Sequence, residues 1–367
     1  MNPKCRDEIN DTDSDDPKSK GCVKFGVTIP WIFPKGQFKP EIVTNVAKTG
    51  EAIGWDSLWC GDHLLHLAGL EVPEAWTLLT ASAMVTNTAR LGTCVTDPHR
   101  HHPAMLAQRL ATIDHFSNGR VILGLGAGDA VNLDTFNIDW EKPVSKLEEY
   151  FHILKMLWSG EKFSHEGRFW KFKDAFLQIQ PRQKSIPIYF AANGPKMLGL
   201  TGRYADGWVP LGLTPEMYKK RLVVVREAAV KAGRNPDEVD PGLFVGVCLT
   251  SSSEKALAMM RARARLLTPQ NLSEAGYDVE FPEKFKNYSP IDWQPTPEYL
   301  NTLGEYVRYV PEEALKDFFI LGNSEECTEK VHEFIKAGVK HFVMQVVAED
   351  YGGMVEDLGQ QVLSSFR

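Results

Sequence analysis

The chain has 367 residues, of which 43% are hydrophobic and 24% charged, a composition typical of a globular protein with a sizeable core. Its formal net charge of −7 gives no general electrostatic attraction to DNA, RNA or anionic lipid. No apolar run approaches the roughly 18 to 20 residues of a membrane span, and the N-terminus lacks the order of a signal peptide, so we expect a cytoplasmic protein whose partners are small molecules.

The first 22 residues differ in character from the rest of the chain. They are polar, acid-rich and nearly free of large apolar groups, so we expect residues 1–22 to be a disordered acidic tail and 23–367 to be a single folded domain. The six cysteines form no C-x-x-C pair, which argues against a disulfide framework and a zinc knuckle. They are Cys5, Cys22, Cys60, Cys94, Cys248 and Cys327.

From Val23 onward, short β-prone runs alternate with amphipathic helical stretches, several of which start with proline. The predicted strands are 23–30, 56–62, 90–97, 120–129, 186–194, 205–212, 242–250 and 341–348. The predicted helices are 40–54, 73–87, 103–119, 144–159, 195–204, 214–232, 253–266 and 324–338. Eight strand–helix units predict an α/β fold, a (β/α)₈ barrel rather than a doubly wound open sheet.

A segment of about 268–310 is too long for a simple connection between elements, and we interpret it as an insertion. It carries aromatic residues, Trp293 among them, and the basic residues Lys284 and Lys286. Insertions at the C-terminal face of a barrel vary the substrate, so we expect this one to contact it; the alternative is a lid that only stabilises the barrel.

Polar and glycine-rich segments follow the predicted strands at 62–63, 96–103, 126–132, 192–196 and 210–212, where a barrel places its chemistry. A metal site is disfavoured, because His99 and His101 do not lie on the first strand and no histidine lies between His165 and His332. A nicotinamide site is also disfavoured, because "GLGAGD" has Asp129 where the third glycine of the dinucleotide fingerprint belongs.

Five motifs point to one family. They are "GWDSLWCGDH" (54–63), "RLGTCVTDPHRHHPAMLAQ" (90–108), "GRVILGLGAGDAVN" (119–132), "PIYFAANGPKMLGLTGRYADGW" (187–208) and "AGVKHFVMQV" (337–346). In this order they resemble the bacterial-luciferase-like superfamily, and within it the oxidoreductases that use the deazaflavin coenzyme F420. The most similar groups by pattern are methylenetetrahydromethanopterin reductase, F420-dependent glucose-6-phosphate dehydrogenase and phthiodiolone ketoreductase.

The resemblance implies hydride transfer between F420 and an organic substrate, either a carbonyl or alcohol or a pterin-like C–N carbon. It places Asp62 and His63 beside the reactive ring carbon, with His63 as acid or base and Asp62 orienting it or touching the ring. Histidine suits that role because its unperturbed pKa lies near 6.5. Asp129 is a second proton-handling group, although the glucose-6-phosphate enzymes have glutamate there. That enzyme's sugar-phosphate residues have no clear match, so glucose 6-phosphate is not the expected substrate. We interpret His66, Arg100, His101 and His102 as rim or solvated residues.

The resemblance also implies a cofactor site. The bare backbone of "GAGDA" and "AANG" admits a planar ring and its phosphate tail, and residues 194–196 start a helix with free amides. In this family a non-prolyl cis peptide, here between Cys94 and Val95, supports the ring. The expected cofactor contacts are Asp62, Cys94, Val95, Thr96, Gly126, Ala127, Gly128, Asp129, Asn132, Ala192, Asn193, Gly194, Pro195 and Lys196.

Two alternatives stay open at this point. The first is an FMN-dependent monooxygenase on the same barrel, and the second is a non-catalytic barrel that binds a ligand or contributes a subunit interface. For the favoured oxidoreductase we also expect a homodimer.

Overall fold

The computed structural model describes residues 23–292, 294 and 296–367. The predicted acidic tail 1–22, with Cys5 and Cys22, lies outside the described residues, and so does Trp293. The four cysteines among the described residues, Cys60, Cys94, Cys248 and Cys327, are free thiols.

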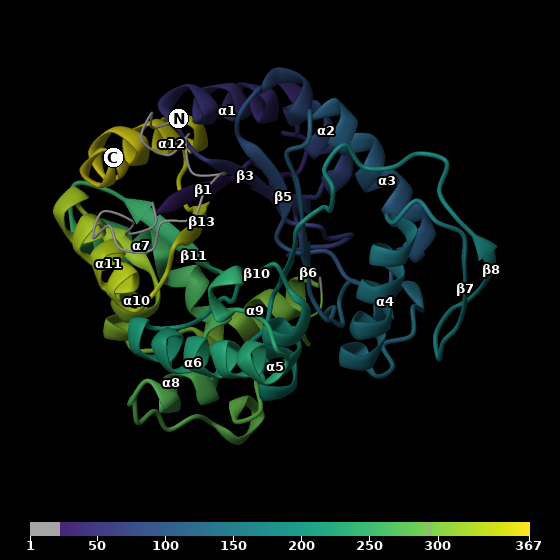
Figure 1. The fold of residues 1–367 in the computed structure, drawn as a ribbon. Helices are drawn as coiled ribbons and strands as arrows, with labels where there is room; N and C mark the ends of the chain where they lie inside the picture. The colour runs from purple at the N-terminus through teal and green to yellow at the C-terminus, as the bar shows by residue number, and fades with distance from the viewer. Residues whose placement is uncertain (1–22, 293, 295) are drawn as a thin grey trace.

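Eight parallel strands close into a barrel, as the sequence predicts. They are β1 (Lys24–Thr28), β3 (Ser57–Cys60), β5 (Arg90–Thr93), β6 (Val121–Leu125), β9 (Ile188–Phe190), β10 (Gly207–Trp208), β11 (Asp240–Leu249) and β13 (His341–Val346). Each strand pairs with the next, and β13 pairs with β1 through Lys24 opposite His341, which completes the circle. Figure 1 looks along this barrel, with the strands around the centre and the helices outside them.

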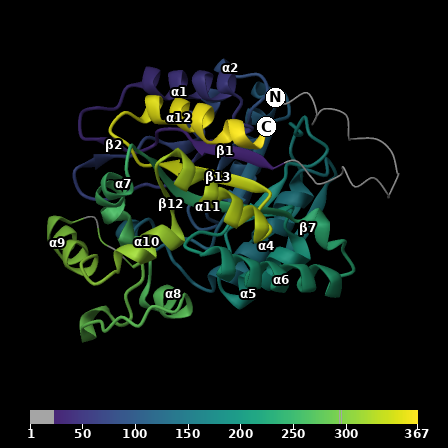
Figure 2. The same cartoon turned by 90° about the vertical axis from the view of Figure 1, so that its left-hand side faces the viewer.

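The helices form where proline or a capping residue fixes their first turn. The surrounding helices are α1 (Pro40–Ile53), α2 (Ala75–Val85), α3 (Pro103–Phe116), α4 (Pro143–Leu157), α5 (Pro195–Tyr204), α6 (Pro215–Lys231), α7 (Ser253–Met260), α11 (Ser324–Lys336) and α12 (Tyr351–Gln361). Five of them begin with proline, whose fixed φ suits that position. Helix α2 instead begins after Glu74, whose carboxylate accepts the Thr77 amide. In Figure 2, α12 lies beside α1, so the last helix closes the outer ring.

Some elements were not predicted. Strand β12 (Ile320–Gly322) pairs with the C-terminal part of β11, while the N-terminal part of β11 pairs with β10. Two small antiparallel sheets join β2 (Phe33–Pro34) to β4 (Leu70–Glu71), and β7 (Phe163–Glu166) to β8 (Lys171–Ala175). In Figure 1 the second of these stands away from the barrel beyond α4. These strands have two to five residues, too few for a periodic apolar signal.

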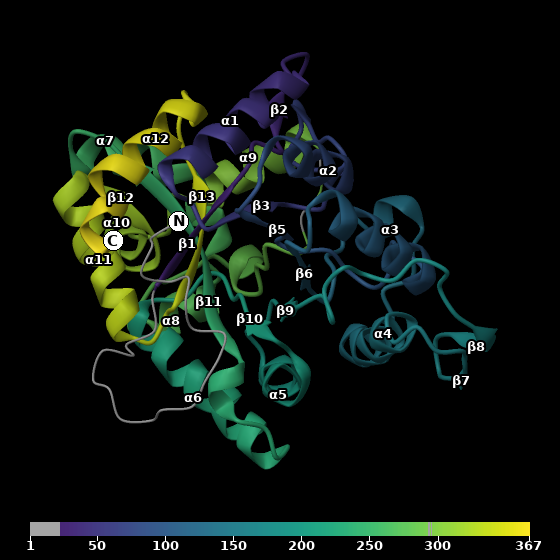
Figure 3. The same ribbon diagram turned by 45° about the horizontal axis from the view of Figure 1, so that its top comes forward.

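The insertion contains α8 (Pro269–Glu274), the 3₁₀ turn Glu283–Phe285 and α9 (Pro297–Tyr306), and α10 (Glu312–Phe318) follows it. Figure 3 shows α8 and α9 apart from each other in this region. Tyr306 is fully buried and stacks on Phe281 and Tyr288 at centroid distances of 5.4 and 3.8 Å. These aromatic side chains therefore pack against one another in the insertion's core, which is continuous with the large apolar core of the barrel. Lys284 and Lys286, which were predicted to face a substrate, are exposed and pair with glutamates at 2.6 Å.

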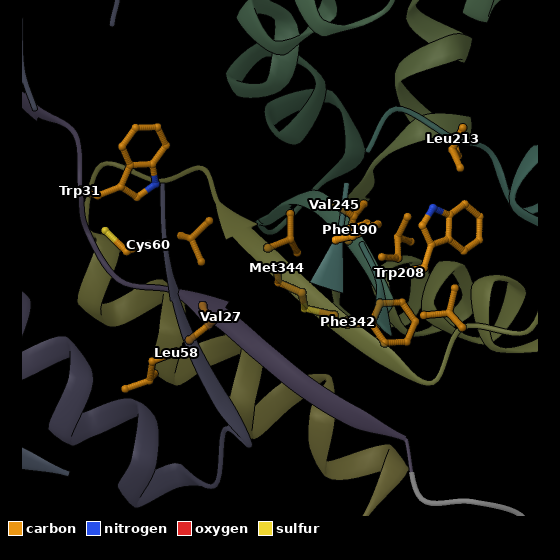
Figure 4. Close-up of a cluster of buried hydrophobic side chains, with 14 of the residues drawn as sticks. Val27, Trp31, Leu58, Cys60, Phe190, Trp208, Leu213, Val245, Phe342 and Met344 are labelled. Atoms are coloured by element: carbon orange, nitrogen blue, oxygen red, sulfur yellow. The ribbon is translucent and has the colours of Figure 1, made fainter. Parts of the chain in front are cut away.

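The core has two parts, because side chains alternate between the two faces of each strand. Between the strands and the helices lies a large apolar cluster, part of which is drawn in Figure 4 with Val27, Leu58, Phe190, Trp208 and Phe342. A smaller cluster fills the barrel interior with Trp59, Ile122, Tyr189, Val209 and Val343. Gly92 makes room for Trp59, since a Cβ there would lie 2.5 Å from the indole ring. The filled interior confines ligands to the barrel mouth.

Candidate active site

Side chains from the loops after β3, β5 and β6 meet at the C-terminal end of the barrel. Thr96 continues β5 and bridges to Leu125, the last residue of β6. The Gly126 amide then donates to the Thr96 carbonyl at 2.8 Å. The Thr96 hydroxyl also donates to Asp62, so the predicted residues at 126–132 lie near those at 62–63, as the barrel prediction requires.

His63, Asn132 and Asp129 form one hydrogen-bonded group. The Asn132 Oδ1 atom accepts the backbone amides of Leu64 and Leu65 at 2.6 and 2.9 Å. Its Nδ2 atom lies 2.7 Å from His63 Nδ1 and 2.8 Å from Asp129 Oδ1. Because two amides fix which end of the Asn132 side chain is oxygen, its nitrogen donates to both His63 and Asp129.

This arrangement fixes the tautomer of His63. Since Nδ1 accepts a hydrogen bond, the proton of the neutral ring lies on Nε2. Burial lowers the pKa of His63, while the negative charge of Asp129, whose Oδ2 lies 3.7 Å from Nδ1, opposes that shift. His63 Nε2 makes no hydrogen bond with any described residue. The neutral ring therefore offers an unused N–H group to a ligand.

Trp31 holds the His63 ring from one side. The two rings are stacked with centroids 5.2 Å apart and planes inclined by 18°. Trp31 is buried and lies just after β1, and Figure 4 shows it at the edge of the apolar cluster. A Cβ at Gly61 would lie 2.6 Å from the indole, so glycine at that position permits the stack. Trp31 was not predicted from the sequence, because its contact with His63 joins two different strand ends.

Asp62 does not hydrogen-bond to His63 within the described part of the chain. It accepts instead from the Thr96 hydroxyl, from Arg100 Nη1 at 3.2 Å and from His101 Nε2 at 3.3 Å. Burial by itself raises the pKa of the Asp62 carboxyl, but His101, Arg100 and Thr96 together hold that pKa well below its usual range. Of the two interpretations given for Arg100, a rim residue or a solvated one, the second is wrong: its side chain is 5% exposed and also binds Asp97.

The segment from Cys94 to Thr96 lies against the loop after β6. The peptide between Cys94 and Val95 is cis, which confirms the expectation from the sequence. A Cβ at Gly126 would lie 2.6 Å from Val95 Cγ2, and Gly128 has a φ of +89° that favours glycine. Glycine therefore lets the two loops approach each other closely.

The predicted residues 192–196 lie at the start of α5, after β9. The Ala192 carbonyl accepts the Trp208 indole at 2.8 Å, and Asn193 Nδ2 donates to the Leu211 carbonyl at 2.9 Å. Gly194 caps α5 without a side-chain hydrogen bond, and a Cβ there would meet no atom within 4 Å. Gly194, Pro195 and Lys196 are exposed. This helix start leaves amide donors free for an anion.

The family described as luciferase-like monooxygenase matches residues 23–341. The chain belongs to this family. It is 32% identical to the phthiodiolone/phenolphthiodiolone dimycocerosates ketoreductase of Mycobacterium tuberculosis, over 80% of this chain and 84% of the relative. It is 31% identical to the F420-dependent glucose-6-phosphate dehydrogenase of Microbacterium testaceum, over 93% of this chain and 99% of the relative.

Among solved structures, the coenzyme F420 dependent tetrahydromethanopterin reductase from Methanopyrus kandleri is similar. The TM-score is 0.79 at 25% identity, over 94% of this chain and 100% of that one. The predicted family resemblance is confirmed, and two of these three proteins, the glucose-6-phosphate dehydrogenase and the tetrahydromethanopterin reductase, are named as F420-dependent enzymes.

Two further properties of the luciferase-like barrel concern metal-binding side chains and membrane-spanning helices. Within the described ranges, no three His, Cys, Asp or Glu side chains are grouped so that they could hold a metal ion. No helix in the same part of the chain is long and apolar enough to cross a membrane.

Proposed function

We propose that the protein is an F420-dependent oxidoreductase that exchanges a hydride with an organic carbonyl or alcohol, or with a pterin-like C–N carbon. The luciferase-like barrel supports this proposal. So do relatives that are named as F420-dependent enzymes and that match this chain over most of their length. Because these relatives are enzymes, they favour this function over a non-catalytic barrel. The observation that carries the proposal is His63, whose Nδ1 is held by Asn132 while Nε2 has no partner among the described residues.

The chain's own groups suit proton transfer beside a hydride acceptor. F420, when bound, supplies or accepts the hydride. In carbonyl reduction the substrate carbon gains the hydride and its oxygen gains a proton, for which His63 Nε2 is the donor. The charged imidazole carries hydrogens on both nitrogens, so its Nδ1 can no longer accept a hydrogen bond from Asn132. Nδ1 must then turn toward the Asp129 Oδ2 atom, which lies 3.7 Å from it. Asp129 thus offsets the positive charge of His63 in the state that gives the proton.

The cofactor contacts fit the same mouth. Cys94, Val95 and Thr96 lie directly against Gly126, so we propose that this segment and the residues Gly126, Ala127 and Gly128 form one continuous part of the wall of the mouth. The uncapped start of α5 supplies donors for the phosphate tail, in the open space around Gly194. We assign Asn132 differently from the sequence prediction, because both ends of its amide already bind the protein. Asn132 is a positioning residue for His63 rather than a ligand of the ring.

A binding experiment tests the proposal against the FMN alternative. Purified protein is titrated with F420 and with FMN, each followed by fluorescence quenching, and oxygen consumption is then measured with each reduced cofactor. We expect F420 to bind at least about tenfold more tightly than FMN, which is a difference of roughly 1.4 kcal/mol, without oxygen uptake. Preference for FMN together with oxygen uptake would instead identify a monooxygenase.

We also propose that the enzyme acts in the cytoplasm as a homodimer, as expected from the sequence. Light scattering on the purified protein measures the oligomeric state directly. A monomer at micromolar concentration would overturn the dimer.

A further inference from the structure

Two arginines near the barrel mouth lack an acidic partner. Arg263 and Arg265 lie in the 3₁₀ turn Arg261–Leu266 that follows α7, and both are half-buried. Arg263 Nη1 donates to the Gln345 side-chain oxygen at 2.7 Å, and Arg265 Nη1 donates to the Ala262 carbonyl at 3.0 Å. No carboxylate of a described residue lies within 4.0 Å of either guanidinium. Arg100, by contrast, binds two carboxylates.

The electrostatics of this pair are unfavourable as they stand. Burial and the positive charge of Arg265 lower the pKa of Arg263 to about 9. Burial, His63 and the two arginines likewise lower the pKa of His66 far below its usual value. Two like charges in a poorly solvated position raise the free energy of the protein unless an anion compensates them. Gln345 is neutral, so it orients Arg263 without removing that charge.

Arg263 and Arg265 lie at the same end of the barrel as His63, the proposed proton donor. Gln345, which binds Arg263, lies near the C-terminal end of β13, at the end of the barrel where the site residues gather, and the positive charges of the two arginines contribute to the lowered pKa of His66. The His66 ring lies 6.0 Å from the His63 ring. The start of α5, where we expect the cofactor's phosphate, follows β9, and β10 and β11 separate β9 from β13 in the barrel. The arginines and the α5 start therefore lie on different parts of the rim.

From this placement we infer that Arg263 and Arg265 form an anion-binding subsite for the substrate. The substrate would carry a phosphate or carboxylate at one end and present its carbonyl or alcohol carbon to His63 at the other. Arg263, held by Gln345, contributes a planar guanidinium that matches both anions. This inference rests on the proposed function for its reacting group, but the binding of the anion is measured independently of it.

The test uses the full chain with Arg263→Gln, Arg265→Gln and Arg263→Lys. The matched control is Arg226→Gln, an arginine of α6 whose side chain is 43% exposed and lies 3.6 Å from Asp237. Calorimetric titrations with inorganic phosphate and with succinate distinguish the two anions, and each is repeated with F420 bound. Fluorescence gives the F420 affinity, and circular dichroism confirms that each variant is folded.

We expect the wild type to bind one of the two anions, with and without F420. Arg263→Gln and Arg265→Gln should each weaken that binding by about tenfold or more, since a hydrogen bond to a charged group is lost. Arg263→Lys should retain part of it, and Arg226→Gln should bind as the wild type does. The F420 affinity of every variant should stay within about threefold of the wild-type value. This is well under the roughly tenfold change that the loss of one hydrogen bond to a charged group would cause.

Three results would overturn the inference. One is that the folded wild type binds neither anion, and another is that the arginine variants bind as tightly as the wild type. The third is that F420 displaces the anion and binds more weakly to the arginine variants, which would assign these arginines to the cofactor. If the wild type binds an anion through the arginines but fails to bind F420, the anion subsite stands and the proposed cofactor is wrong.

Discussion

The Asn132 amide nitrogen lies 2.7 Å from His63 Nδ1 and donates a hydrogen bond to it. The direction of this bond is set by the backbone, because the Leu64 and Leu65 amides both donate to the oxygen of the same side chain. A residue after β6 thus determines which nitrogen of a histidine after β3 carries the proton. This contact, rather than Asp62, orients the ring.

Replacing Asn132 by Asp should raise the pKa of His63. The substitution keeps an oxygen for the Leu64 and Leu65 amides but puts a carboxylate oxygen where Nδ2 donated to His63 and to Asp129, so two carboxylates then lie beside His63 Nδ1. A carboxylate beside Nδ1 favours the charged imidazole, against the burial that lowers the pKa of His63. The limb of the kcat–pH profile that reports this group should move upward by about one unit or more. A profile that coincides with that of the wild type would refute the proposed hydrogen-bond direction, and Asn132→Ala, which adds no charge, is the control.

Replacing His63 by Ala should separate chemistry from cofactor binding. The ring stacks on Trp31 and has an unused Nε2, so its loss removes a proton donor. We expect turnover to fall by roughly 10² or more, the usual scale for a general acid or base. F420 affinity, measured by fluorescence quenching, should change only a few-fold. Unchanged turnover would exclude His63 from the proton transfer.

The sequence predicted the barrel because its signals are local. Helices begin at Pro40, Pro103 and Pro195, and the apolar runs between successive helices form the buried strands. The family motifs added the cis peptide and pointed to His63 and Asp129 as candidates for the same site. The roles of Trp31 and Asn132 were missed, since each depends on a contact between different strand ends. The contact of Arg263 with Gln345 joins residues 82 apart and leaves no local pattern.

Replacing Asp62 by Asn should destabilise the protein at neutral pH. The carboxylate is buried with Arg100, so its removal should lower the free energy of unfolding by about 3 kcal/mol. Because the folded pKa of Asp62 lies below its unfolded value of about 3.9, this stability is present above that pH and is lost as pH falls toward the folded pKa. Urea unfolding from pH 7 to 3 should show that the difference in unfolding free energy between wild type and variant narrows only below about pH 5. The exposed Glu356→Gln serves as control, and a gap independent of acidity down to pH 3 would contradict the assignment.

Replacing Tyr306 by Ala should affect stability and not cofactor binding. Its buried ring stacks on Phe281 and Tyr288, and its hydroxyl donates to the Leu267 carbonyl at 2.5 Å. Removing a buried aromatic side chain should lower the free energy of unfolding by about 3 kcal/mol. The neighbouring Tyr309 is 36% exposed, so Tyr309→Ala should be milder. A large loss of F420 affinity in folded Tyr306→Ala would show that the insertion's core also shapes the cofactor site.

Replacing Gly194 by Ser should weaken F420 binding without destabilising the fold. Serine is a good N-cap residue, and the backbone at Gly194 is extended with no atom within 4 Å of a Cβ, so the helix accepts the change. The new hydroxyl would accept the amide of Lys196 or Met197, which are the donors that we assign to the cofactor's phosphate. The melting temperature should stay level or rise slightly, while the Kd for F420 increases about tenfold, as expected for one charge-assisted hydrogen bond. Gly199→Ala is the matched control, because it also meets no atom within 4 Å but lies inside α5, where alanine should stabilise the helix by about 1 kcal/mol and leave F420 binding unchanged. If Gly194→Ser binds F420 as tightly as Gly199→Ala, the phosphate does not bind at the start of α5.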